Sequence, residues 1–224
     1  MMYARPRLLP LGDTALTIEF GTDIEPAAQA AVRACDRALR ETGPSGVIEV
    51  IPTYRSVTVQ FDPTVISRRG LAAWLEGRDF SGVVAEEERP PVVIPVVYGG
   101  TDGPDLADVA VITGLTPDEV IRRHAAAVYT VYMIGFLAGF PYLGGLPPEL
   151  AVPRLETPRT KVPAGSVGLA GVQTGVYPAE SPGGWRLIGR TSVRLWDPTR
   201  DRPSLLEPGD RVRFEPITRE EFDR

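Results

Sequence analysis

The chain has 224 residues, enough for one large domain or two small ones that each bury a hydrophobic core. Its 43% hydrophobic and 24% charged residues are ordinary for a globular protein, and a net charge of −5 with a pI near 5.1 argues against a general nucleic-acid binder. With one cysteine, Cys35, and one histidine, His124, the chain cannot form an internal disulfide, and a zinc site of such side chains is implausible.

The sequence also predicts a location. No uncharged apolar run approaches the roughly 18 residues of a membrane helix, and the first residues lack the apolar segment of a signal peptide. We therefore expect a cytoplasmic protein without a membrane partner.

The first 85 residues predict a small α/β sandwich. Leu16, Ile18 and Phe20 alternate with polar residues, which indicates a half-buried strand. A helix begins at Pro26, with Cys35 beside its apolar side, and ends at Gly43. That apolar side is formed by Ala27, Ala31, Ala34, Ala38 and Leu39. Strands at 47–54 and 56–61, a helix at 64–76 and a strand at 80–85 complete the expected sandwich.

The segment EEERPP at 86–91 is charged, lacks an apolar anchor and ends in two prolines, as linkers do. It predicts an N-terminal α/β domain at 1–86 and a second domain at 91–224.

The second domain begins with a strand at 92–98 and two helices at 105–112 and 117–127. Thr116 and Glu119 have the spacing of a capping box around Pro117. The two helices resemble a helix-turn-helix, but Asp118 and Glu119 would face DNA phosphates with like charge, so we reject DNA binding. From residue 129 onward, short apolar runs broken by Gly and Pro predict a β-barrel.

The stretch from 129 to 185 is unusually rich in glycine, proline and aromatic residues. Two interpretations remain open: an irregular β core plugged by aromatic rings, or a surface shaped for a ligand. We expect a cleft lined by side chains from both parts of this stretch, namely Phe140, Tyr142, Gln173, Tyr177 and Trp185.

Several polar residues are candidates for chemistry. His124 is the only imidazole, so it is either a packed, hydrogen-bonded residue or a group that moves a proton. Arg154, Arg159 and Lys161 form a basic run between prolines; they either make surface salt bridges or bind a carboxylate or phosphate.

Gln173 and Thr174 lie between Gly171 and Gly175, a setting that suits ligand contact better than core. With Tyr177 and Ser181 they form a set of neutral hydrogen-bonding groups. The glycines match neither GxGxxG nor GxxxxGK[ST], and no serine has a GxSxG context, so the chain has neither a complete nucleotide loop nor an activated nucleophile.

Four blocks of this region resemble the allophanate hydrolase subunit 1 family: GFLAGFPYLGGL at 135–146, PRTKVPAGSVGLAG at 158–171, QTGVYP at 173–178 and SPGGWRLIGRT at 181–191. The resemblance is strongest from about 105 to 214 and weaker in LGDTALTIEF at 11–20. Ala138 stands where the family commonly has proline, so this loop is expected to be less rigid.

The resemblance implies an α+β protein: a small N-terminal α/β sandwich (ferredoxin-like) followed by a cyclophilin-like β-barrel. It further implies the B subunit of an ATP-dependent 5-oxoprolinase, which works with a C subunit and an A-like subunit and opens 5-oxo-L-proline to L-glutamate. ATP with Mg²⁺ is then expected at the level of the complex, and the chain alone is expected to be inactive.

In that scheme Arg159 or Lys161 holds a carboxylate or phosphate, Gln173 binds the lactam and His124 moves a proton. The aromatic loops at 136–146 and 177–185 are the expected docking surface for a partner subunit. Two other functions known in the family stay open: an inhibitor of a sensor histidine kinase, and a carboxyltransferase half that acts on urea derivatives.

Overall fold

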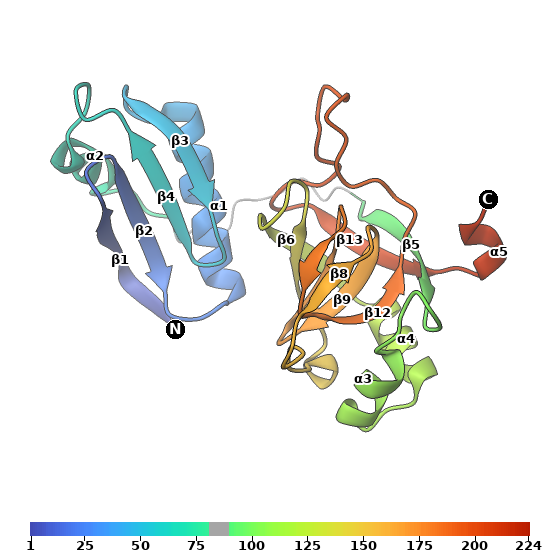
Figure 1. Ribbon diagram of the computed structural model, residues 1–224. Coiled ribbons are helices and arrows are strands. Elements are labelled where there is room, and N and C mark those ends of the chain that lie inside the picture. Colours follow the sequence, from blue (N-terminus) through green and yellow to red (C-terminus); the bar gives the residue numbers. More distant parts are fainter. Residues whose placement is uncertain (81–89) are drawn as a thin grey trace. The chain divides into compact units, whose positions relative to one another are not determined.

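The computed structural model describes residues 1–80 and 90–224. The chain divides into two compact units, residues 1–87 and 88–224, each of which has its own hydrophobic core (Figure 1). Among the described residues, no helix is long and apolar enough to cross a membrane.

The first unit is a four-stranded antiparallel sheet with two helices on one face (Figure 1). The strand order is β1–β2–β4–β3, with β1 at Met2–Leu11, β2 at Ala15–Gly21, β3 at Val47–Pro52 and β4 at Ser56–Phe61. The helices are α1 (Pro26–Thr42) and α2 (Arg68–Leu75). Leu16, Ile18 and Phe20 face the helices, as their alternation predicts.

Several expectations for this unit need correction. The sequence did not reveal β1, because MYARPRLLPL lacks alternation. The helix α2 begins only after Ser67, whose hydroxyl accepts the N–H of Gly70, whereas Thr64 bonds to Asp62 in a turn before it. Ala27 is exposed, and the buried side of α1 is instead formed by Ala28, Gln29, Ala31, Val32, Cys35 and Leu39.

The strand expected at 80–85 falls on residues 81–89, outside the described part of the chain, apart from Phe80. Phe80 is buried with its ring edge-on to Phe20, at a centroid distance of 6.0 Å. Strand β1 forms the edge of the sheet next to β2. The ferredoxin-like arrangement of the unit stays a prediction.

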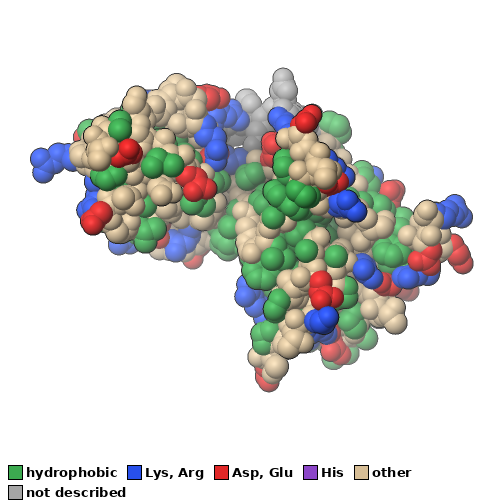
Figure 2. All heavy atoms as spheres, turned by 45° about the horizontal axis from the view of Figure 1, so that its top comes forward, with side chains coloured by type: hydrophobic (Ala, Val, Ile, Leu, Met, Phe, Trp, Pro, Cys, Tyr) green, Lys and Arg blue, Asp and Glu red, His purple; other side chains and the backbone are tan. Residues whose placement is uncertain are grey.

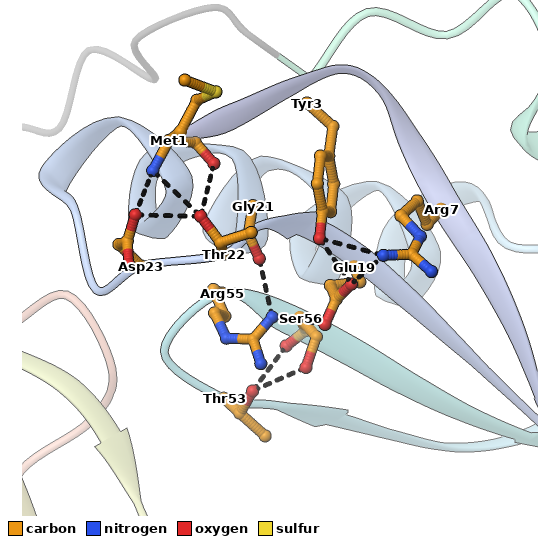
Figure 3. A network of polar contacts seen from close by, with 10 residues as sticks. All are labelled: Met1, Tyr3, Arg7, Glu19, Gly21, Thr22, Asp23, Thr53, Arg55 and Ser56. Atoms are coloured by element: carbon orange, nitrogen blue, oxygen red, sulfur yellow. Dashed lines mark hydrogen bonds and ion pairs between the residues drawn. The ribbon is translucent and has the colours of Figure 1, made fainter.

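On the sheet face away from the helices, a polar network joins β1, β2 and the turn before β4 (Figure 3). Arg55 donates to the carboxylate of Glu19 and to the carbonyl of Gly21, and the hydroxyl of Tyr3 donates to Glu19 at 3.1 Å. Burial alone would raise the pKa of Glu19, but these hydrogen bonds lower it below its usual value. The network therefore holds a charged carboxylate on the sheet face opposite α1 and α2.

The second unit is built on a closed seven-stranded barrel (Figure 1). Its neighbouring strands are antiparallel except for β5 and β13, which run parallel. In order around the barrel the strands are β10 (Gln173–Val176), β7 (Pro141–Gly144), β6 (Val128–Ile134), β13 (Arg211–Pro216), β5 (Val92–Tyr98), β12 (Arg186–Arg190) and β9 (Ser166–Ala170). The predicted barrel is thus confirmed, while its assignment as cyclophilin-like stays a prediction.

Two helices, α3 (Leu106–Thr113) and α4 (Pro117–Ala126), pack Val109 and Val120 into the same core as the barrel interior. Thr116 caps α4 by accepting the N–H of Glu119. The reciprocal half of the expected capping box is replaced, because the Glu119 carboxylate binds Arg122 and Arg123. A short η1 (Pro148–Leu150) and a terminal α5 (Arg219–Phe222) complete the unit.

A second layer lies on the outside of the barrel. This layer contains the two-stranded sheet of β8 (Arg159–Val162) and β11 (Ser181–Gly183). Every residue of β9 and β10 is buried, because the barrel core covers one face of these strands and a separate hydrophobic cluster covers the other. That cluster contains the aromatic residues of the Gly-rich stretch.

Candidate functional site

His124 lies in the core of the second unit and is 0% exposed. Its Nδ1 lies 2.8 Å from the hydroxyl of Tyr98, and its Nε2 lies 3.0 Å from Oγ1 of Thr174. The Thr174 hydroxyl donates its single hydrogen to the carbonyl of Gly168, so it accepts from the Nε2–H of the ring. Nδ1 then accepts from Tyr98, and the ring stacks on Phe214 at 4.5 Å. We call Tyr98, His124 and Thr174 the inner polar chain.

Burial lowers the pKa of His124 to about 3, so the ring is neutral at physiological pH. Burial likewise raises the pKa of the Tyr98 hydroxyl, which keeps it a donor. Both ring nitrogens have partners, and Thr174 is 0% exposed as well. Both are packed, hydrogen-bonded core residues, which is the first of the two alternatives considered for His124; the proposed functional roles of the two residues stay predictions.

The four aromatic residues predicted to gather do so, in a cluster on the outer face of the barrel wall. The Phe140 ring lies 4.8 Å from Tyr142, 5.2 Å from Tyr177 and 5.5 Å from Trp185, centroid to centroid. We call Phe140, Tyr142, Tyr177 and Trp185 the outer aromatic cluster. Phe140, Tyr177 and Trp185 are 1%, 1% and 4% exposed, so they form packed rings rather than the walls of an open cleft. Tyr142 is half-buried.

Glycines in the signature blocks make room for these rings. A Cβ on Gly175 would lie 3.0 Å from the Trp185 ring and 3.1 Å from the Phe140 ring. A Cβ on Gly183 would overlap with the Tyr177 hydroxyl oxygen. The glycine-rich pattern therefore reflects, at these positions, aromatic rings that lie directly on the backbone.

Gln173 has the same outward orientation as Gly175, because residues two apart on a strand point to the same face. Gly175 pairs with Tyr142 across the sheet, so Gln173 lies diagonally from Tyr142 beside the outer aromatic cluster. It is 8% exposed. Gln173 and Tyr142 are thus brought together as the sequence predicts, with Gln173 facing away from its neighbour Thr174.

The basic residues have different surroundings. Lys161 is exposed and its ammonium pairs with Glu180 at 3.1 Å, which is the surface salt bridge considered above. Arg159 donates through Nη2 to the buried carboxylate of Asp105 at 2.6 Å, and its Nη1 is enclosed. Both side chains thus form the salt bridges that were one of the two alternatives, and binding of a carboxylate or phosphate by either stays a prediction. Arg154 is exposed, and its guanidinium lies 5.9 Å from the centre of the Trp185 ring.

Ser181 belongs to β11, is 7% exposed and pairs with Val162 of β8 in the outer layer. Its hydroxyl oxygen is enclosed and has no hydrogen-bond partner in the described part of the chain. Ser181 is thus a buried residue of the outer layer, and its expected contact with a ligand stays a prediction.

The loop before β7 presents an exposed ring. Phe136 is 60% exposed and has φ +64°, the one positive φ of a non-glycine residue in the described ranges. The N–H of Leu137 donates to the carbonyl of Gly135 at 2.7 Å, so Phe136 sits at the centre of a strained γ-turn. The Phe136 ring lies edge-on to Phe140 at 5.7 Å. Sequence reasoning placed Phe136 in a docking loop, but the backbone strain had no signal in the sequence.

The described residues contain no group of three or more His, Cys, Asp or Glu side chains that could hold a metal ion. The polar groups at the edge of the outer aromatic cluster are instead Arg154, Tyr142 and Gln173. This arrangement places a cation and an amide near each other, and it contains no nucleophile with an adjacent base.

Comparison with known proteins places the chain in a family. Residues 6–206 match the family described as carboxyltransferase domain, subdomain C and D. The chain is 42% identical to the 5-oxoprolinase B subunit of Bacillus subtilis (strain 168), over 99% of this chain and 97% of that protein. It is 44% identical to the 5-oxoprolinase B subunit of Escherichia coli O157:H7, over 95% of this chain and 96% of that protein.

Among solved structures, the crystal structure of TTHA0988 matches with a TM-score of 0.82 and 41% identity. The match covers 91% of this chain and 40% of that one, so the present chain spans less than half of the longer protein. The chain belongs to the carboxyltransferase domain family, subdomains C and D.

Proposed function

We propose that this chain is the B subunit of an ATP-dependent 5-oxoprolinase that opens 5-oxo-L-proline to L-glutamate. The observation that carries the proposal is the similarity to the 5-oxoprolinase B subunit of Bacillus subtilis, which extends over 97% of that protein. Two proteins that are 42% identical over nearly their whole length share their fold.

The chemistry requires coupling, because hydrolysis of an unstrained lactam is unfavourable. Transfer of the γ-phosphoryl group of ATP to the lactam oxygen makes the ring carbon electrophilic. Water adds to that carbon, the C–N bond breaks to release the amine, and the resulting acyl phosphate is hydrolysed by a second water. The products are glutamate, ADP and phosphate.

We assign this chain a binding role in that reaction. Gln173 lies beside the outer aromatic cluster, and we propose that its amide, whose Nε2 is enclosed in the free chain, binds the lactam in the complex by donating to the lactam oxygen and accepting from the lactam N–H. His124, enclosed and neutral, supports the barrel rather than moving a proton. ATP with its metal is expected at the level of the complex, and we propose that a partner subunit binds it.

The partners we propose are the C subunit and an A-like subunit of the same enzyme. Phe136 is the proposed contact, because it is an exposed aromatic ring on a strained loop, and strained backbone is concentrated at functional sites. The chain alone is then inactive, and its cytoplasmic location stays a prediction.

The test is reconstitution with the neighbouring gene products, measured as ADP release that depends on 5-oxo-L-proline. We expect activity from the complex and none from this chain alone. Gln173→Ala is expected to lower kcat/KM at least tenfold, the effect of losing hydrogen bonds to a buried lactam, while the isolated chain stays folded. Full activity of the Gln173→Ala complex would remove the proposed role of Gln173.

The same reconstitution separates the other functions of the family. A complex that turns over urea derivatives but not 5-oxo-L-proline would assign the chain to the carboxyltransferase half instead. A chain that forms no complex with these subunits and inhibits autophosphorylation of a sensor histidine kinase would assign it to the inhibitors.

A further inference from the structure

Arg154 differs from the other cations near the outer aromatic cluster in having no carboxylate partner in the described ranges. Arg159 pairs with Asp105 at 2.6 Å, Lys161 with Glu180 at 3.1 Å and Arg186 with Asp108 at 3.9 Å. Figure 2 shows acidic and basic side chains interspersed over the visible surface. Arg154 therefore contributes a positive charge that its surroundings do not neutralise.

The backbone on either side of Arg154 is fixed. Val152 bridges to Gly171 next to β9, and the carbonyl of Pro153 accepts a hydrogen bond from Nε of Arg186 at 3.0 Å. The N–H of Leu155 donates to the carbonyl of Gly184 at 2.8 Å, beside Trp185. A guanidinium on a fixed backbone loses less entropy when it binds an anion than one on a mobile loop.

The guanidinium of Arg154 is also close to the groups that would contact a ligand. It lies 5.9 Å from the centre of the Trp185 ring. Burial raises the pKa of Tyr142, and the charge of Arg154 partly offsets that increase, which places the two groups within electrostatic reach. Gln173 lies diagonally from Tyr142 on the same outer face.

We propose that Arg154, with Tyr142 and Gln173 beside it, is the specificity-determining residue that binds the carboxylate of a small cyclic amide. The proposal deepens the function proposed above and rests on it for the identity of the amide. A guanidinium matches the two oxygens of a carboxylate. The amide of Gln173 matches the lactam group, which 5-oxo-L-proline carries next to its carboxylate.

The experiment compares four ligands on the full chain by ligand-observed NMR titration. 5-Oxo-L-proline carries both groups, 2-pyrrolidinone has only the lactam, cyclopentanecarboxylate has only the carboxylate, and inorganic phosphate tests a site for a phosphoryl group. The variant is Arg154→Met, which keeps an apolar stem over Trp185 and removes the charge. The matched control is Arg213→Met, which removes an exposed charge from β13.

We expect 5-oxo-L-proline to bind about 10- to 100-fold more tightly than 2-pyrrolidinone, and Arg154→Met to abolish that difference while Arg213→Met preserves it. In the assembled complex, Arg154→Met should raise KM for 5-oxo-L-proline by a similar factor with kcat nearly unchanged, as expected for a group that binds substrate and transition state alike.

The four ligands and the two variants distinguish failure of the proposed carboxylate site from failure of the proposed 5-oxoprolinase function. Arg154-dependent binding of both carboxylates by a chain whose complex leaves 5-oxo-L-proline intact would support the site and refute the proposed function. Arg154-dependent binding of phosphate alone would overturn the assignment to a carboxylate. Equal affinities of wild type and Arg154→Met for every ligand, or no binding at all by the wild-type chain, would overturn the inference.

Discussion

At the scale of single residues, the ring of His124 carries two hydrogen bonds of opposite direction. Nε2–H of the ring donates to the hydroxyl of Thr174, which in turn donates to the carbonyl of Gly168. Nδ1 of the ring accepts from the hydroxyl of Tyr98. A protonated ring would have to donate from both nitrogens, and Tyr98 would then have to reverse its hydroxyl in an enclosed space. The hydrogen bonds and the burial therefore favour the same neutral form.

The first prediction concerns this titration. The pKa of His124 is about 3 in the folded chain and about 6.5 when unfolded, so between these values the unfolded chain binds the extra proton. The contribution of His124 to stability is complete above pH 6.5 and decreases as the pH falls. Titration of His124 should therefore lower the free energy of unfolding by about 2 kcal/mol between pH 8 and pH 5.

His124→Gln should remove this contribution and be less stable by about 1–3 kcal/mol at pH 8, because the ring packing on Phe214 is lost. Urea unfolding of both proteins at pH 8 and pH 5 measures the effect. The chain has no second histidine, so the difference between the two proteins isolates the ring. If the free energy of unfolding fell by the same amount from pH 8 to pH 5 in the wild type and in His124→Gln, the prediction would be contradicted.

The second prediction tests the space above Gly175. Gly175→Ala would push a Cβ against the carbonyl of Pro141 (2.8 Å) and the rings of Trp185 and Phe140. We expect a loss of about 1–3 kcal/mol in the free energy of unfolding. Gly184→Ala is the matched control, since its Cβ would make only ordinary contacts with Pro158 from 3.5 Å. Equal unfolding midpoints for the two variants would show that the rings move away without cost.

At the scale of elements, regular patterns predicted the fold well. The alternation in β2 and the start and end signals of α1 and α4 gave elements within one or two residues of those observed. The first strand was missed because an edge strand needs no alternating pattern when most of its residues are exposed. Local composition indicates where a segment can bend, but it does not determine which other strand the segment pairs with.

The candidate site was predictable as a region and not as a set of roles. The glycines and aromatic residues predicted where the outer aromatic cluster lies in the sequence. The same residues, however, are compatible with both a packed core and an open cleft. Gln173 and Thr174 are neighbours in the sequence and point to opposite faces of β10, so only one of them faces outward. The pairing of Arg159 with Asp105, 54 residues earlier, depends on tertiary contacts that local sequence does not encode.

The third prediction belongs to the loop at 135–140. Asparagine tolerates positive φ better than phenylalanine, so Phe136→Asn should leave the isolated chain as stable as the wild type or slightly more stable. If the ring is a docking anchor, the variant should bind the partner subunit at least tenfold more weakly. Calorimetry of the free chain and titration with the purified partner measure the two effects.

Val111→Asn is the control, because Val111 is an 83% exposed apolar residue on α3. It should bind the partner as the wild type does. Unchanged partner affinity in Phe136→Asn would refute the docking role, and a large loss of stability in the free chain would show that the ring serves folding.

At the scale of the whole molecule, the two hydrophobic cores do not share residues. One is built from residues 16–80 and the other from residues 94–214, and the outer aromatic cluster belongs entirely to the second unit. Arg154, Tyr142 and Gln173 are positioned by strands and loops of that unit as well. The barrel unit therefore contains the proposed binding residues together with the core that holds them.

The last prediction follows from this separation. A fragment of residues 91–224 should fold alone, since it keeps every strand of the closed barrel from β5 to β13 and leaves no barrel edge open. It should bind 5-oxo-L-proline with the affinity of the full chain, and Arg154→Met should weaken binding equally in both. Residues 1–86 should bind none. Circular dichroism and the same NMR titration test the fragment, with a version ending at residue 209 as the control. Loss of β13 opens the barrel between β6 and β5, so the control should not fold. A folded 91–224 fragment that binds more weakly than the full chain would show that the first unit contributes to the site.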